Sequence, residues 1–140
     1  MDEFTRREII MEHYQNPKNK KEIKDETYKK VNTNNSSCID NLDIYVKIKD
    51  NIIEDICFSG EACAISTSSC SIMITNLIGK TKEEAKEFIK NFENMIEEKE
   101  YQEELLNEAL AYNEIYKQNN RKNCALLPYK GMKKLFEELS

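Results

Sequence analysis

The feature that most constrains the fold is a strict alternation of apolar and polar side chains over residues 42–49. A period of two over eight residues predicts a β-strand with one buried face. Asp50 and Asn51 follow as turn-forming residues, and the apolar residues of segment 52–58 predict a returning strand. The sequence therefore predicts an antiparallel hairpin.

The length of the connecting loop decides how the two strands pair. A three-residue loop of residues 49–51 would pair Ile44 with Ile56 and would place the apolar residues of both strands on one face. Only Glu54 is then out of place. A two-residue loop would instead bring Asp55 to the buried face, so we predict the three-residue loop.

Helical periodicity dominates from residue 64 onward, and a further helix over residues 2–15 opens the chain. We predict a single α+β domain spanning residues 1–140: a small antiparallel sheet of about three strands packed against a group of helices, with an N-terminal helix first and a helical C-terminal half. The other predicted elements are a short strand at 27–31, helices at 64–78, 81–96 and 101–117, a polar loop at 118–123, and a final helix carrying Met132, Leu135, Phe136 and Leu139.

Charge and hydropathy exclude some classes of function. The net charge of −5 argues against nonspecific nucleic-acid binding, because a phosphate backbone requires a basic face. The first residues are charged, which predicts no signal peptide, and no apolar run approaches the ~20 residues that span a bilayer. We therefore expect a cytoplasmic protein without a membrane partner, in which the five cysteines are reduced thiols. Each cysteine taken alone is equally well explained as a small buried apolar residue.

The predicted hairpin brings reactive side chains together at its open end. One further step of pairing would set Asp40 opposite Gly60 and Cys38 near Ala62, with Cys63 next along the chain. Side chains two residues apart in an extended segment point the same way, as do those of Cys38 and Asp40. A glycine opposite them allows the backbones to approach closely.

Cys63 and Cys124 are each expected at the start of a helix, which favours an anion. Both thiols should then ionise below the usual pKa of about 8.5. A set of Cys38, Asp40, Cys63 and Cys124 would suit a tetrahedral zinc ion or an iron–sulfur cluster, with Asp40 as the harder and more exchangeable ligand. Structural cysteines remain the alternative interpretation at this point.

Four segments stand out in order along the chain: residues 10–19, 35–40, 60–66 and 123–127. They are similar, respectively, to the motifs HY-x-NP, NP-x-CGD and G-x-x-C-x-I-S and to a third cysteine motif. These motifs resemble those of the family of iron–sulfur scaffolds that includes IscU, SufU and the N-terminal domain of NifU, and the resemblance covers nearly the whole chain.

The resemblance implies that Cys38, Asp40, Cys63 and Cys124 bind zinc. It further implies that a pyridoxal-phosphate-dependent, SufS-like cysteine desulfurase passes persulfide sulfur to one of the three cysteines, with Cys124 favoured. Such a protein would be a zinc-dependent sulfurtransferase, if it is an enzyme. A second implied role is a scaffold on which a transient [2Fe–2S] or other cluster is assembled and handed to carriers or apo-protein acceptors. An alternative of another class is a non-catalytic binding module with a structural zinc.

Within the family the sequence looks closer to SufU, because Asn123 stands where IscU-like members have histidine and the segment before Cys124 is long. Arg121 matches a basic position of SufU that could offset the charge of the site; a solvated loop charge is the equal alternative. Ile39 replaces the glycine of CGD and would be strained if φ there is positive. Ser36 and Ser37 replace the proline-containing pair.

Three further residues stand apart from the predicted site. We expect Cys57 on the other face of the hairpin. Cys70 follows Cys63 by two helical turns and is predicted to be a buried filler rather than an extra reactive thiol. His13, the only histidine of the chain, is predicted to be structural.

Overall fold

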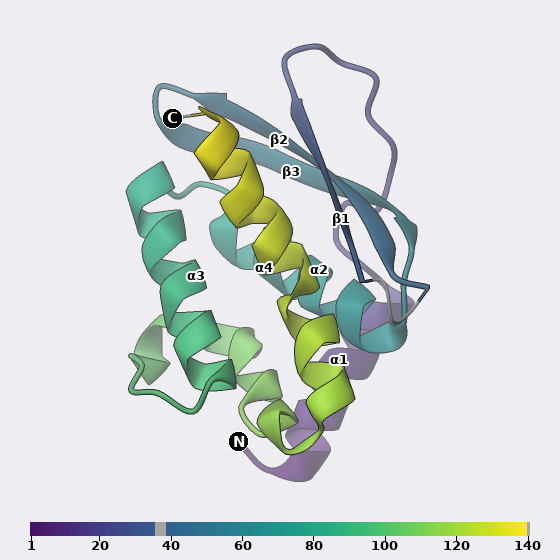
Figure 1. Cartoon of the computed structure of the whole chain (residues 1–140), viewed down its shortest axis with the longest axis vertical. Coiled ribbons are helices and arrows are strands. Elements are labelled where there is room, and N and C mark those ends of the chain that lie inside the picture. The colour runs from purple at the N-terminus through teal and green to yellow at the C-terminus, as the bar shows by residue number, and fades with distance from the viewer. Residues whose placement is uncertain (36–38, 140) are drawn as a thin grey trace.

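The computed structural model describes residues 1–35 and 39–139. An antiparallel sheet has the strand order β1-β2-β3, and helices precede and follow it (Figure 1). The predicted α+β class, with one N-terminal helix and a helical C-terminal half, is confirmed. The elements are α1 (Glu3–Gln15), β1 (Lys29–Asn34), β2 (Asn41–Lys49), β3 (Ile52–Glu61), α2 (Ala64–Leu77), α3 (Lys82–Ile96), the 3₁₀ helices η1 (Glu103–Leu105), η2 (Asn107–Tyr112) and η3 (Ile115–Lys117), and α4 (Asn119–Leu139).

The hairpin turn contains two residues, not three. Asp50 and Asn51 have φ angles of 53° and 65°, and Lys49 pairs with Ile52. Two consecutive left-handed residues are what a tight two-residue turn needs to match the twist of its strands, and aspartate and asparagine tolerate that conformation. The predicted three-residue loop is therefore wrong.

A bulge removes the objection to the shorter loop. The pairing shifts at Lys47, which lies opposite Asp55, so that Glu54 has no partner across the ladder. The extra residue resets the alternation, and Val46 then pairs with Ile56 instead of Asp55. The apolar face of the hairpin is thus continuous, as predicted. Its buried members are Leu42, Ile44, Val46, Ile53, Ile56 and Phe58.

The corrected register also changes the open end of the hairpin. Leu42, not Asp40, lies opposite Gly60, and Asn41 pairs with Glu61 as the last pair of the ladder. Asp40 therefore lies one residue beyond the ladder, beside the start of α2. Gly60 has a φ of 116°, and a Cβ there would overlap the Asn41 carbonyl oxygen. The close backbone approach that was predicted at Gly60 is present, against a different partner.

Helix α4 runs across the sheet and packs on β1, β2, α2 and α3 (Figure 1). It begins at Asn119, so the segment 118–123, predicted as a loop, belongs to this helix except for residue 118. Segment 101–117 contains the three 3₁₀ helices rather than one continuous helix, and β1 begins at residue 29 instead of 27. Met132, Leu135 and Phe136 are buried as predicted, whereas Leu139 is exposed.

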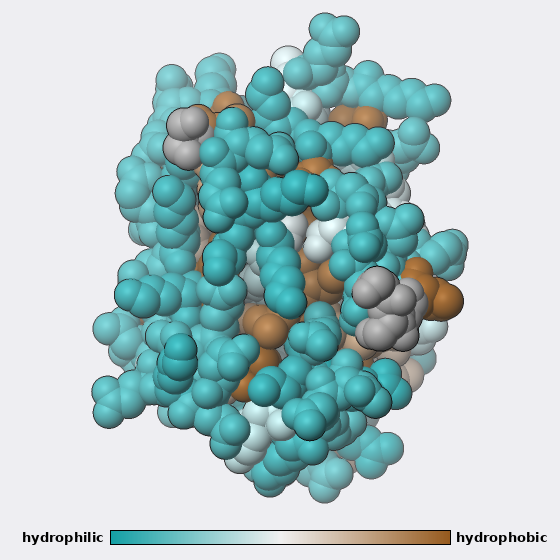
Figure 2. Space-filling model, viewed as in Figure 1, coloured by the Kyte–Doolittle hydropathy of each residue, from teal (hydrophilic) through white to brown (hydrophobic). Residues whose placement is uncertain are grey.

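The core lies between the sheet and the helices. Thr81 and Glu84 form a capping box at the start of α3. The apolar stripe of α3 is fully buried, and Phe92 stacks on Tyr129 of α4 with 4.0 Å between ring centroids. The face of the molecule shown in Figure 2 is mostly hydrophilic, with apolar side chains visible in separate places. In the part of the chain that the structure describes, no helix is long and apolar enough to cross a membrane.

Candidate metal centre

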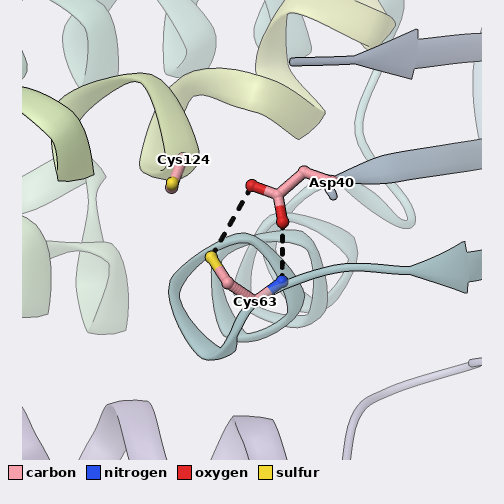
Figure 3. Close-up of side chains that lie close together, drawn as sticks. All are labelled: Asp40, Cys63 and Cys124. Carbon is pink, nitrogen blue, oxygen red and sulfur yellow. Dashed lines mark hydrogen bonds between the residues drawn. The ribbon is translucent and has the colours of Figure 1, made fainter. Parts of the chain in front are cut away.

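Three elements that are distant in sequence bring a carboxylate and two thiols together (Figure 3). Asp40 immediately precedes β2, Cys63 is the N-cap of α2, and Cys124 is the sixth residue of α4. One ligand atom from each, a carboxylate oxygen or a sulfur, lies within 4.8 Å of the other two. Cys38, the fourth predicted ligand, lies outside the described residues.

The two oxygens of Asp40 have different partners. Oδ1 accepts the backbone N–H of Cys63 at 2.7 Å, which attaches the carboxylate to the N-terminus of α2. Oδ2 accepts the hydroxyl of Ser66 at 2.8 Å and lies 3.6 Å from the Cys63 sulfur. The side chain is almost completely buried, with 1% of the residue exposed. Oδ2 is therefore the oxygen that faces the thiols.

Opposing effects set the charge of Asp40. Burial, the largest of them, would raise its pKa, but hydrogen bonds from the Cys63 backbone, Ser66 and the two thiols together hold the pKa below the usual 3.8. Hydrogen bonds to the charged form of a carboxyl group act in this direction. Asp40 is therefore an anion at neutral pH.

Cys63 lies at a helix N-terminus, as predicted. Its extended backbone, with φ −67° and ψ 170°, is the usual conformation of a cap residue, and its sulfur accepts the N–H of Ser66 at 3.5 Å. The thiol thus occupies the position where serine or aspartate usually caps a helix, and the positive end of the helix dipole favours an anion there.

Cys124 does not lie at a helix start, and its predicted easy ionisation is wrong. The residue is inside the first turns of α4 and is 5% exposed, and its sulfur lies 3.6 Å from the Asn120 carbonyl oxygen. Burial, together with the neighbouring Cys63 and the negative charge of Asp40, raises the pKa of Cys124 to about 12. Without a cation nearby, this thiol therefore stays protonated at neutral pH.

The chemistry of these donors fits a thiophilic cation. A tetrahedral zinc site has ligand atoms ~3.3–3.8 Å apart, given Zn–S distances of ~2.3 Å and Zn–O distances of ~2.0 Å. The donors here span at most 4.8 Å, so shifts of about an ångström would close the set. A divalent cation would reverse the effect of Asp40 on Cys124, since a coordinated thiol loses its proton. These residues can therefore hold a metal ion.

The residues that sequence analysis left outside the site lie elsewhere. Cys70 is fully buried in the core and burial raises its pKa, as expected of a filler. Cys57 is also buried, and its thiol lies 3.5 Å from Asp55. Burial, together with the Asp55 carboxylate, raises the pKa of Cys57 to about 11. Neither thiol belongs to the metal-binding group.

The structure supplies partners for His13 that the sequence did not reveal, and they support its predicted structural role. Its Nδ1 lies 2.7 Å from the Ser71 hydroxyl and its Nε2 lies 3.0 Å from Glu108. The ring therefore connects α1 to α2 and to η2. Ser71 also accepts the backbone N–H of Lys18 at 2.8 Å, which fixes the chain after α1.

Two predictions concerned the surroundings of the ligands. Ile39 is 75% exposed, and the strain expected there if its φ is positive stays a prediction. Arg121 lies in the first turns of α4 and is exposed. Its role in offsetting the charge of the site stays a prediction.

Sequence analysis missed the contribution of Ser66. The sequence analysis assigned no part in the site to the serines of α2. The detectable signal was the spacing: a hydroxyl three residues after a capping cysteine lies beside the cap. Ser66 is fully buried and contacts Asp40, Cys63 and Cys124.

Comparisons with known proteins agree with this geometry. The chain is 36% identical to the zinc-dependent sulfurtransferase SufU of Bacillus subtilis over 129 residues, covering 91% of this chain and 86% of that protein. It is 30% identical to the iron–sulfur cluster assembly scaffold protein IscU of Thermotoga maritima, covering 76% and 75% of the two chains. The crystal structure of FiSufU from Fervidobacterium islandicum superimposes with a TM-score of 0.87 at 35% identity, covering 91% and 93% of the two chains. The NifU-like N terminal domain matches residues 5–125, and the chain therefore belongs to this family.

Proposed function

We propose that the protein takes part in iron–sulfur cluster assembly, as a zinc-dependent sulfurtransferase that accepts persulfide sulfur from a cysteine desulfurase. The observation that carries the proposal is the convergence of Asp40, Cys63 and Cys124 within 4.8 Å. The name of the relative SufU supports a zinc-dependent sulfurtransferase, and the name of the relative IscU supports a part in iron–sulfur cluster assembly. Cys38 is proposed as the fourth ligand from its motif alone.

Zinc, when bound, would keep its cysteine ligands deprotonated near neutral pH. The residues of the chain would then hold the oxygen ligand and supply the attacking thiolate. The Cys63 backbone and Ser66 hold Asp40 as an oxygen ligand. A thiolate, with Cys124 the favoured candidate, attacks the terminal sulfur of the desulfurase persulfide. A new sulfur–sulfur bond forms, the bond within the partner's persulfide breaks, and the partner's cysteine leaves as a thiolate.

The burial of Cys124 adds a requirement. A residue that is 5% exposed is not accessible to a partner's persulfide, so the ligand set must open before sulfur arrives. If zinc is bound, Asp40 would be its most exchangeable ligand, because a carboxylate is a harder ligand for zinc than a thiolate. A ligand set of three thiolates and one carboxylate oxygen would therefore allow one ligand, the carboxylate, to exchange.

The experiment is zinc analysis combined with a desulfurase-stimulation assay. We expect one zinc per chain and faster turnover of a SufS-like desulfurase, with both lost in Cys63→Ser and Cys124→Ser. Cys70→Ala is the matched control, since this thiol is buried but lies outside the site. Zinc retained in both serine variants would contradict the proposal.

A second function uses the same donors. Thiolates also bind iron–sulfur clusters, and the Thermotoga relative is named a scaffold. Reconstitution with iron and sulfide should then give a cluster that transfers to an apo-protein acceptor, whereas the sulfurtransferase proposal predicts zinc and desulfurase stimulation instead.

A structural zinc in a non-catalytic module is the third possibility. It predicts that Asp40→Ala unfolds the domain, because metal binding would then supply part of the folding free energy. The sulfurtransferase proposal predicts that Asp40→Ala stays folded and loses stimulation. Circular dichroism on the purified variant distinguishes the two. The cytoplasmic location and the single-domain organisation stay predictions.

A further inference from the structure

One buried side chain touches all three of the ligand residues that the structure describes. The Ser66 hydroxyl lies 2.8 Å from Asp40 Oδ2, 3.0 Å from the Cys124 carbonyl oxygen and 3.7 Å from the Cys63 sulfur. The residue is fully buried in α2, between the sheet end that carries Asp40 and the helix that carries Cys124. A hydroxyl in this position links the donors of three separate elements.

The hydroxyl has one hydrogen and two good acceptors. A carboxylate oxygen and a backbone carbonyl both need a donor, and a serine hydroxyl supplies a single hydrogen. Both distances, 2.8 Å and 3.0 Å, are within hydrogen-bond range. The hydrogen is therefore shared between Asp40 and Cys124.

Pro128 is the reason why the Cys124 carbonyl competes for this hydrogen. In an α-helix the N–H of residue 128 would bond to the carbonyl of residue 124. Proline has no N–H, so Pro128 leaves the Cys124 carbonyl without its usual helical donor. A buried carbonyl without a donor is unfavourable, and Ser66 satisfies it.

We propose that Ser66 is a positioning residue of the metal centre: its hydroxyl orients Oδ2 of Asp40 toward the metal, and Pro128 limits that bond by presenting a second acceptor. The inference rests on the proposed metal site and adds to it a control over the exchangeable oxygen ligand. Hydrogen-bond partners behind metal ligands commonly change metal affinity by 10- to 100-fold.

Ser69 provides a matched control. Its hydroxyl donates to the Ala125 carbonyl at 2.6 Å, and the residue is as completely buried as Ser66. Both serines thus connect α2 to a backbone carbonyl of α4, one residue apart along α4. Ser69 has no hydrogen bond to Asp40 among the described residues. Ser66→Ala should lower the stability of the metal-free protein more than Ser69→Ala, because the Ala125 carbonyl still faces the N–H of Tyr129 whereas the Cys124 carbonyl faces Pro128. The comparison of the two variants therefore rests on metal affinity and ligand geometry.

The test uses Co²⁺ alone as the probe. Competition against a chelator measures the affinity for Co²⁺, and the thiolate-to-cobalt absorption bands report the geometry of the ligands. We expect Ser66→Ala to bind Co²⁺ at least tenfold more weakly and to change the absorption spectrum. Ser69→Ala should stay within threefold of the wild type with an unchanged spectrum. In an Asp40→Ala background, Ser66→Ala should add less than a threefold effect. Equal losses in the two serine variants would overturn the inference.

Pro128→Ala tests the same idea without removing a hydroxyl. The new N–H would donate to the Cys124 carbonyl and release the Ser66 hydrogen to Asp40. Co²⁺ binding should then be tighter; unchanged binding would contradict the role of Pro128, and a loss greater than threefold would contradict the inference as a whole. If the wild type binds no Co²⁺ at its cysteines, the proposed function itself fails. If it binds Co²⁺ but Ser66 and Ser69 behave alike, only the role of Ser66 fails.

Discussion

Gly60 should be the backbone position at the site that tolerates substitution least. Its φ is 116°, and a Cβ would overlap the Asn41 carbonyl oxygen across the hairpin. Gly79 offers a matched comparison, because its φ is 91° but a Cβ would meet no atom within 4 Å. Gly79→Ala therefore isolates the conformational cost, whereas Gly60→Ala adds a backbone clash to it.

The expected losses in the free energy of unfolding follow from these contacts. A non-glycine residue forced to positive φ costs on the order of 1–3 kcal/mol, so we expect Gly79→Ala to lower the free energy of unfolding by about 2 kcal/mol. Gly60→Ala should cost about 4 kcal/mol or more, since the strands must separate to relieve the overlap. A domain of this size has only ~5–15 kcal/mol of stability. The same displacement would move Asp40 away from Cys63, because Asp40 directly precedes β2.

Urea unfolding of the metal-free variants, followed by far-UV circular dichroism, measures both costs. Zinc retention after dialysis measures the displacement of Asp40. We expect Gly60→Ala to hold zinc more weakly than the wild type and Gly79→Ala to hold it as tightly. The reasoning is refuted if the two variants lose equal stability, or if Gly60→Ala binds zinc as tightly as the wild type.

The remaining predictions concern individual side chains. Cys124 has a pKa of about 12, so about one thiol in ten thousand should be ionised at pH 8 in the metal-free protein. Iodoacetamide should therefore label Cys124 far more slowly in the folded protein than in protein unfolded in urea. Equal labelling rates would contradict its burial. His13→Ala removes contacts to Ser71 and Glu108 and should cost about 1–3 kcal/mol in urea unfolding without changing zinc content; lost zinc would contradict a purely structural role. The folded pKa of Asp40 is lowered, so its contribution to stability is present above the unfolded value of about 3.9 and is lost as pH falls through the folded value. The stability difference between metal-free wild type and Asp40→Asn should accordingly shrink from pH 7 to pH 3, and a constant difference would show that the charge contributes nothing.

The hairpin shows what an alternation of apolar and polar residues predicts and what it leaves open. Alternation assigns each side chain to a face, and those assignments for β2 are confirmed by the burial of Leu42, Ile44 and Val46. The pattern does not distinguish registers that differ by two residues, because both keep the same faces inside. The bulge at Glu54 and the left-handed pair Asp50 and Asn51 settle the register through backbone conformation.

The candidate site shows the same limit. The proximity of Asp40 to Cys63 was predictable, because a hairpin brings its two ends together. The depth of Cys124 was not, since it depends on α4 beginning at Asn119 and crossing the sheet. That burial reverses the expected pKa change. The spacing of three residues places Ser66 beside Cys63, but its contacts with Asp40 and Cys124, like those of His13 with Ser71 and Glu108, are tertiary contacts that local sequence patterns do not encode.

X-ray absorption at the zinc edge of the purified protein tests the central claim most directly. A site of Cys38, Asp40, Cys63 and Cys124 predicts three sulfur neighbours at ~2.3 Å and one oxygen at ~2.0 Å from each zinc. Asp40→Ala should remove or replace the oxygen and leave the three sulfurs. Zinc surrounded only by oxygen and nitrogen, or no zinc in protein prepared without chelator, would contradict the account.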